Sequence, residues 1–306
     1  MREPFARRNR ANPAKFGFGC GPEATVVACG QPLEWLHLPA WSRVPVLSPV
    51  RYRHSTPVAR CVDMTPSSEV PPVSGSFGVV ATGDWPETIR QMLPMMPRVL
   101  LSLRPSWSLA GIEMIDVDFL AEAGLRTLIW DVDGTLTHHH SCQLAAEAVT
   151  AFRQLREVEG LQHVIASNCG EQRFVSLSEV FRDVPIVKAY RAEDGPVARI
   201  RVNDDESWSS MPRGRLIPLR KPDPRVILAA VQALGISDYS SVAMVGDQHL
   251  TDVAAANLAG IRSIKVPTTG SAERPFMVRL LQAADAAAYF VMKLVPIRQT
   301  GAHQRR

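Results

Sequence analysis

Short apolar segments alternate with amphipathic segments along the middle of the chain, and this alternation restricts the fold more than any other feature. Buried strands are expected at 125–132, 163–167, 184–190, 241–246 and 261–266. Helices are expected between them at 141–159, 171–181, 224–235 and 251–259, with Ser141 capping the first. Strands that alternate with helices form a parallel sheet with helices on both faces. The sequence therefore predicts an α/β fold, a three-layer Rossmann-like core with a mainly parallel sheet.

The segment 1–91 differs from this core in composition. It holds half of the 24 prolines and shows no sustained helical or alternating pattern. Such a segment buries too little apolar surface to offset the entropy of ordering it. We interpret 1–91 as a disordered or loosely ordered extension. An over-long translated start, with Met64 or Met92 as the true one, remains the alternative.

Composition excludes several classes of protein but does not indicate a particular reaction. Hydrophobic residues make up 46% of the 306 residues and charged residues 21%, which is typical of globular proteins. No apolar run approaches the roughly 20 residues of a membrane-spanning helix. The net charge of +4 is too small to indicate nucleic acid, and the basic residues lack interleaved aromatics. Five cysteines without framework spacing fit a reducing compartment.

Polar side chains gather just after the expected strands, where parallel sheets place their ligand crevice. Asp131 and Asp133 follow the first strand, and their carboxylates suit nucleophilic attack on phosphorus and proton transfer. Ser167 and Asn168 follow the second strand and suit the binding of phosphoryl oxygens. Lys221 offers a charge that neutralises both nucleophile and phosphate.

Asp247 and Asp252 follow the fourth expected strand and bring the number of aspartates to four. Four carboxylates in one crevice repel one another and raise one another's pKa values. A hard divalent cation removes this repulsion, and Mg²⁺ favours a few carboxylates together with water and phosphate oxygens. The sequence therefore predicts a Mg²⁺ site.

These clusters resemble, in order, the four motifs of the haloacid dehalogenase-like (HAD) superfamily over about 125–268. The resemblance implies that Asp131 is the nucleophile, forming an aspartyl-phosphate, and that Asp133 is the general acid/base. Lys221 and Ser167 would bind the phosphoryl group, and the motifs also place Asn168 and Thr135 among the substrate-binding residues.

The resemblance further implies that Mg²⁺ is held by Asp131, Asp247 and the backbone carbonyl of Asp133, with Asp252 supporting the metal. An acid at Asp133 favours a phosphatase or phosphotransferase, because dehalogenases lack it. The chain is most similar to the capless subfamily III A, to YqeG-type proteins and their relatives that dephosphorylate phosphatidylglycerophosphate. This closer match rests on Gly246–Val253, Asn257, Gly260 and Ile264–Pro267, and on the lead-in 115–124.

Motif spacing leaves no room for a large cap domain, only a small insertion at 193–217 with a hairpin through 197–202. We divide the remainder into an apolar lead-in segment at 92–122, the phosphatase core at 123–268, and an amphipathic helix with a basic tail at 269–306. The lead-in and the C-terminal helix could lie on an anionic membrane surface or pack against the core.

The sequence thus predicts a Mg²⁺-dependent phosphomonoester hydrolase that is cytoplasmic or peripheral at the inner membrane surface. Its expected partner is a phosphorylated substrate, with phosphatidylglycerophosphate favoured by resemblance. A soluble sugar-phosphate or nucleotide phosphatase is one alternative, and a non-catalytic phosphate-sensing module is another.

Overall fold

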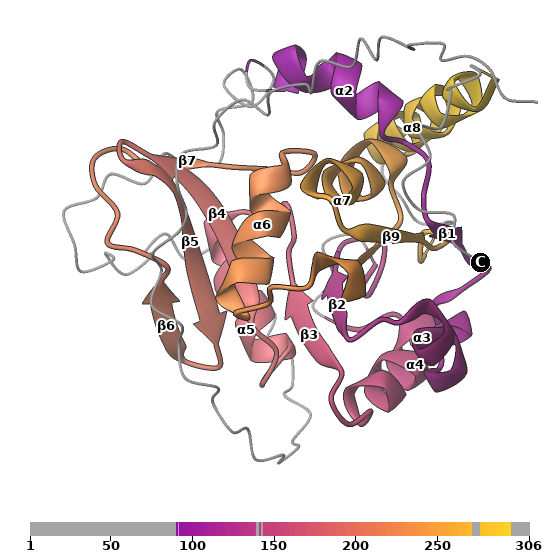
Figure 1. The fold of residues 1–306 in the computed structure, drawn as a ribbon, viewed down its shortest axis with the longest axis horizontal. Coiled ribbons are helices and arrows are strands. Elements are labelled where there is room, and N and C mark those ends of the chain that lie inside the picture. The colour runs from indigo at the N-terminus through magenta and orange to yellow at the C-terminus, as the bar shows by residue number, and fades with distance from the viewer. Residues whose placement is uncertain (1–89, 91, 139–140, 142, 271–275, 295–306) are drawn as a thin grey trace, which may run out of the picture. The chain divides into compact units, whose positions relative to one another are not determined.

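The structure, a computed structural model, describes residues 90, 92–138, 141, 143–270 and 276–294 (Figure 1). The expected N-terminal extension, apart from Arg90, and the basic tail after Leu294 lie outside the described residues.

The described residues form one mixed sheet flanked by helices. Its strands are β1 (Trp107–Ser108), β2 (Thr127–Trp130), β3 (Gln162–Ile165), β4 (Ile186–Ala192), β5 (Gly195–Val202), β6 (Asp205–Trp208), β7 (Ile217–Pro218), β8 (Val242–Gly246) and β9 (Arg262–Lys265). The helices are α2 (Met96–Leu101), α3 (Val117–Ala123), α4 (Ala146–Arg156), α5 (Glu171–Val180), α6 (Pro224–Ala233), α7 (Ala254–Ala259) and α8 (Phe276–Leu294). Short helical turns are η1 (Leu93–Met95), η2 (Ile112–Met114), η3 (Tyr239–Ser241) and η4 (His249–Val253).

The strand order is β1-β9-β8-β2-β3-β4-β5-β6, with β7 paired to β4. All pairings from β1 to β4 are parallel, whereas β5, β6 and β7 add an antiparallel extension. The expected α/β class with a mainly parallel sheet is confirmed. Because β2 is central and buried on both faces, all four of its residues are buried.

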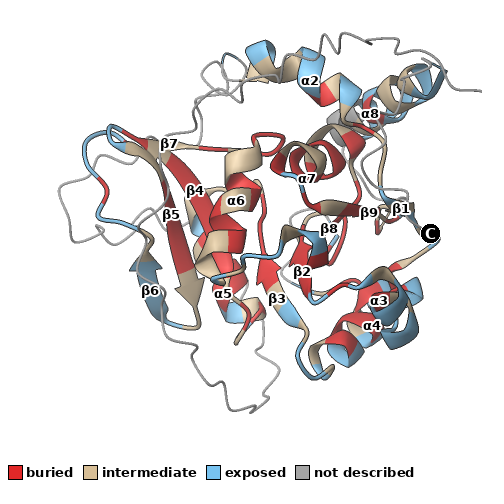
Figure 2. Cartoon of the chain, in the orientation of Figure 1, coloured by how far each residue is buried: buried red, intermediate tan, exposed pale blue. Residues whose placement is uncertain are grey.

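Helices cover both faces of the sheet (Figure 1). Alternate side chains of β2 point to opposite faces: Leu128 and Trp130 join one hydrophobic cluster and Ile129 joins the other. Helices α3, α4 and α5 pack on the first face, and α6 and α7 on the second. Figure 2 shows that the buried residues lie along the strands and on the inner sides of these helices.

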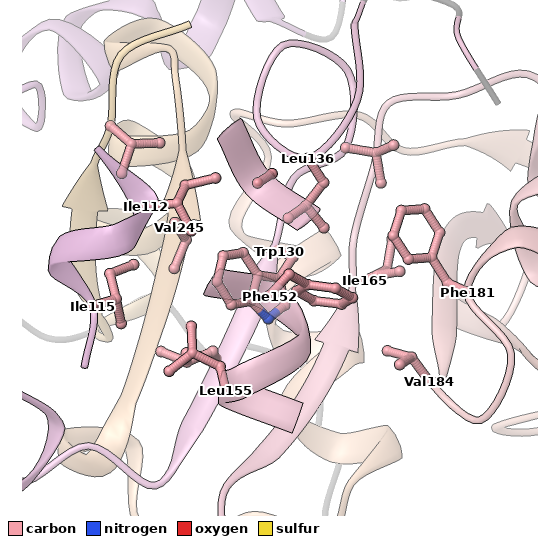
Figure 3. Close-up of a cluster of buried hydrophobic side chains, with 14 of the residues drawn as sticks. Ile112, Ile115, Trp130, Leu136, Phe152, Leu155, Ile165, Phe181, Val184 and Val245 are labelled. Carbon is pink, nitrogen blue, oxygen red and sulfur yellow. The ribbon is translucent and has the colours of Figure 1, made fainter. Parts of the chain in front are cut away.

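Edge-to-face aromatic contacts fill the cluster on the first face (Figure 3). Phe152 of α4 packs with ring planes near perpendicular against Trp130, at 5.3 Å between centroids, and against Phe181, at 5.8 Å. Such pairs add about 0.5–1.5 kcal/mol to the free energy gained by burial. This packing anchors β2 immediately before Asp131.

Helices α2 and α8 lie together on the outer side of α7 and η4. Val99 and Leu103 of the lead-in are buried against Ala254, and Tyr289 and Met292 of α8 pack on this cluster. Asn257 donates hydrogen bonds to the carbonyls of Ser102 and Arg104, at 2.7 and 2.8 Å. The lead-in is therefore joined to the second half of the core.

The helix after β2 starts later than the sequence indicates. Its N-cap is Ala145, and the Ser141 hydroxyl instead accepts a hydrogen bond from the Gln143 amide at 3.0 Å. The prediction that Ser141 caps it was wrong because the loop before the helix pairs with the turn after β2, through Thr137 opposite Leu144. Residues 197–202, where the sequence indicated a hairpin, instead lie within the single strand β5, which pairs with β4 on one side and β6 on the other.

Candidate active site

The turn after β2 presents Asp131 at the carboxyl end of the sheet. The amides of Thr135, Leu136 and Thr137 all donate to the Val132 carbonyl, at 2.9–3.1 Å, which closes the turn tightly. Gly134 has a φ of +91°, and a Cβ there would lie 2.8 Å from Asp247 Oδ2. Glycine therefore allows the turn to approach Asp247, which directly follows the neighbouring strand β8.

Lys221 connects two carboxylates inside the site. Its Nζ lies 2.6 Å from Asp131 Oδ1 and 2.7 Å from Asp252 Oδ1, and all three residues are buried. The Asn168 amide fixes the backbone of Lys221: its Oδ1 accepts from the Lys221 N–H at 2.8 Å and its Nδ2 donates to the Lys221 carbonyl at 3.1 Å. Burial opposes the charge on Lys221, but Asp131 and Asp252 outweigh it, so the pKa of Lys221 is raised.

Asp131, Asp247 and Asp252 form a buried acidic cluster, with one oxygen of each within 4.8 Å of the others. Burial raises the pKa of Asp131 well above its usual range; Lys221 opposes the rise, and Asp252 and Asp247 add to it. Burial, and next the charge of Asp252, raise the pKa of Asp247 to about 7. Both Asp247 oxygens lack a hydrogen bond of ordinary geometry within the described residues. One Lys221 charge does not balance three carboxylates, so the cluster suits a divalent cation.

The Asp133 carboxylate is held outside this cluster by an arginine. Arg173, in the first turns of α5, donates from one NH₂ group to Asp133 Oδ1 at 2.7 Å and to the Ser141 carbonyl at 2.8 Å. Both side chains of the ion pair are mostly buried. Arg173 thus fixes Asp133 against the loop that precedes α4.

A polar crevice opens over these groups. It is lined by Asp131, Asp133, Ser167, Asn168, Lys221, Gln248, Thr251 and Asp252. Residues from the ends of β2, β3 and β8 and from the segment before α6 thus share one cavity, although they are up to about 120 positions apart. Carboxylates, a hydroxyl, an amide and a buried ammonium together can bind an anionic group beside a cation.

The HAD-hydrolase-like family model matches residues 218–294. The chain is also 26% identical, over 183 residues, to phosphatidylglycerophosphate phosphatase 1, chloroplastic/mitochondrial, of Arabidopsis thaliana. That alignment covers 60% of this chain and 46% of the relative, so the chain spans less than half the length of the relative.

The resemblance to the HAD superfamily is confirmed. The matched region includes Lys221, Asp247 and Asp252 of the site.

A solved structure of an uncharacterized protein from Listeria monocytogenes serotype 4b aligns at 20% identity and a TM-score of 0.31, over 56% of this chain and all of the other. A second solved structure aligns at 16% identity and a TM-score of 0.35, over 56% of this chain and 86% of the other. Likeness at this level identifies no family.

The candidate site brings together most of the residues expected from the sequence. Asp247 and Thr135 are buried and do not line the crevice, and the Thr135 hydroxyl has no hydrogen bond within the described residues. The Asn168 amide, expected to bind substrate, is engaged with the Lys221 backbone. The metal and substrate roles of these residues stay predictions.

Sequence reasoning assigned no role at the candidate site to Arg173, Gln248 or Thr251. Gln248 and Thr251 lie inside the segment that carries Asp247 and Asp252, and that proximity is a signal that could have found them. Arg173 follows Asn168 by five positions, in the helix that leaves the second polar cluster. An arginine on that first turn is the sequence signal for it, because such a helix starts at the crevice.

Proposed function

We propose that this chain is a Mg²⁺-dependent phosphomonoester hydrolase that acts through an aspartyl-phosphate on Asp131. The observation that carries the proposal is the contact of Lys221 Nζ with both Asp131 and Asp252, beside the buried carboxylate of Asp247. Similarity to HAD-like hydrolases and to a phosphatase of Arabidopsis supports it.

In the first step, a carboxylate oxygen of Asp131 attacks phosphorus as the ester P–O bond breaks. Asp133, which carries a proton at the start of this step, gives that proton to the departing ester oxygen, which leaves as an alcohol. In the second step, Asp133 takes a proton from water, whose oxygen attacks the same phosphorus. The P–O bond to Asp131 breaks, inorganic phosphate leaves, and both aspartates return to their starting states.

Lys221 and Ser167 stabilise the phosphoryl oxygens in both steps. Mg²⁺ would be held by Asp131, Asp247 and the Asp133 carbonyl, with Asp252 in support, and would neutralise the charge that keeps a carboxylate from a phosphate. The three-carboxylate cluster fits that ion, because its oxygens converge and its charge exceeds that of Lys221.

For the substrate, we favour the phosphate of phosphatidylglycerophosphate. Similarity to the Arabidopsis phosphatase supports this choice. An exposed face of α8 also supports contact with a membrane surface: Phe290, Val291 and Leu294 are each more than half exposed. Exposed Arg279 and Lys293 lie near its ends, and its one acid, Asp285, is buried. Within the described residues, every helix is too short or too polar to span a bilayer.

The catalytic proposal is tested with an aryl phosphate and Mg²⁺. Asp131→Asn should abolish turnover, and Asp133→Ala should slow it roughly 10²–10⁴-fold, the range typical of a general acid/base. Turnover that survives Asp131→Asn would contradict the nucleophile. A folded wild-type chain without turnover that still binds phosphate would instead be a phosphate-sensing module.

The substrate is tested with a panel of lipid and soluble phosphates under the same conditions. We expect the highest kcat/KM on phosphatidylglycerophosphate. Faster hydrolysis of sugar phosphates or nucleotides, with none of the lipid, would overturn the substrate and leave the chemistry standing. Sedimentation with anionic vesicles tests whether the exposed face of α8 contacts a membrane. Val291→Ser should weaken binding to the vesicles. Val117→Ser, which changes an exposed valine on α3, should leave binding unchanged.

A further inference from the structure

The C-terminal helix α8 reaches the segment that carries Asp247 and Asp252. The carboxylate of Asp285, in the middle of α8, accepts two hydrogen bonds from backbone amides of this segment. The His249 N–H donates to Oδ2 at 3.0 Å, and the Leu250 N–H donates to Oδ1 at 2.6 Å. Asp285 is only 6% exposed. These two amides are the first of the helical turn η4. Asp285 therefore caps the start of this turn, although it belongs to a helix far away in the sequence.

A second contact from α8 supports the same turn. The rings of His249 and Tyr289 are stacked, with centroids 3.9 Å apart and planes within 7°. Nδ1 of His249 lies 3.0 Å from the Leu103 carbonyl of the lead-in segment. One residue of η4 is therefore fixed on both sides by elements outside the core.

The two amides held by Asp285 lie between the candidate metal ligands in the sequence. Asp247 precedes them, and Asp252 lies at the other end of the turn, where its Oδ2 accepts the Gln248 amide at 3.1 Å. A displacement of residues 249–250 is therefore expected to move both carboxylates relative to Asp131, which follows another strand, β2. Metal affinity depends on such supporting contacts as well as on the ligands.

We propose that Asp285 is a positioning residue for the metal site, through which α8 sets the placement of Asp247 and Asp252. This inference rests on the Mg²⁺ site of the proposed function and adds to it a residue outside the superfamily motifs. Asp285 belongs neither to the lining of the crevice nor to the acidic cluster of the described residues; it acts through the backbone of η4.

The test measures Mg²⁺ binding to the full chain by titration calorimetry, well below the unfolding temperature and without substrate. Asp285→Asn keeps the shape of the side chain but leaves one acceptor oxygen for two backbone amides. We therefore expect the Mg²⁺ dissociation constant to rise roughly 10-fold, within the 10–100-fold typical of supporting contacts. With Mg²⁺ in excess, kcat on an aryl phosphate should fall by less than about 3-fold.

Two further variants separate positioning from charge and from folding. Tyr289→Leu removes the ring stacked on His249 without changing charge, and we expect it to weaken Mg²⁺ binding in the same direction. If Asp285→Asn does not fold, Tyr289→Leu is the variant that tests the inference. Asp118→Asn removes an exposed carboxylate on α3 and should leave the dissociation constant unchanged.

The inference would be overturned if folded Asp285→Asn bound Mg²⁺ with unchanged affinity. If Asp285→Asn failed to fold, unchanged affinity in Tyr289→Leu would overturn it. Either result would leave the proposed function intact. A lower unfolding temperature with unchanged affinity would make Asp285 a structural residue only. A wild-type chain that binds no Mg²⁺ would contradict the metal site itself, and this inference with it.

Discussion

Arg173 and Asp133 form the residue pair that most directly controls proton transfer in the proposed reaction. A general acid/base has to lie within hydrogen-bond reach of the ester oxygen, and the guanidinium fixes one oxygen of Asp133 while leaving the residue at the crevice. Arg173 also binds the Ser141 carbonyl, so the position of Asp133 depends on the loop before α4 as well as on α5.

Replacing Arg173 by methionine should lower kcat on an aryl phosphate roughly 10- to 100-fold, because small displacements of a catalytic group cost about that much. KM should change by less than about 3-fold, and Arg173→Lys should restore part of the rate. Steady-state kinetics on the purified variants measure both constants. Arg153→Met, at an exposed position of α4, is the matched control. Wild-type kcat in Arg173→Met would contradict the positioning role.

His163 gives the fold a dependence on pH. Its Nδ1 accepts the Trp130 Nε1–H at 3.0 Å and its Nε2 lies 3.1 Å from the Leu155 carbonyl, an arrangement that only the neutral ring with a proton on Nε2 satisfies. Burial lowers the pKa of His163 to about 4. The unfolded chain therefore takes up a proton at a higher pH than the folded chain does.

This contribution to stability is complete above about pH 6.5 and is lost as the pH falls toward 4, because protons then favour the unfolded state. Between pH 7 and pH 5 the wild type should lose about 1–2 kcal/mol more free energy of unfolding than His163→Gln, which cannot titrate. Urea unfolding of both proteins at the two pH values measures the difference. Equal losses would contradict the assignment.

At the scale of elements, one carboxylate of α5 binds side chains of both β4 and β5. Glu171, in the first turn of α5, accepts hydrogen bonds from Lys188 Nζ (2.6 Å) and Tyr190 OH (2.8 Å) of β4 and from Arg199 of β5 (2.8 Å). Lys188 and Arg199 are buried, so Glu171 neutralises cations that water does not reach.

Glu171→Gln should lower the free energy of unfolding by about 2–4 kcal/mol, somewhat less than for a fully buried pair because Glu171 itself is 21% exposed. Glu147→Gln is the matched control, since Glu147 also lies in the first turn of a helix but is exposed; it should change stability by under about 1 kcal/mol. Chemical denaturation measures both. Equal effects of the two changes would show that the buried cations do not need Glu171.

For the whole molecule, the sequence predicts those features that follow from the parallel sheet. Strand ends that share one edge bring Asp131, Ser167 and Asp247 together, so their proximity could be predicted from the order of the segments. The direction of a side chain on a distant helix depends on how that helix packs, and so the contact of Asp285 with η4 could not be predicted in the same way. Ser141 was misassigned because its loop pairs with the turn after β2, a tertiary contact that outweighs its preference for a helix cap.

The central place of β2 has a consequence for biosynthesis. Thr127 pairs with Gln162 on one side and with Val242 on the other, so the strand that leads to Asp131 stays half-paired until distant residues have been translated. Pairing across such a separation comes late in folding, because a long loop has to close first. A nascent chain is therefore expected to expose one edge of β2 until β8 emerges from the ribosome, and only then does it gain Asp247 and Asp252, which complete the buried acidic cluster.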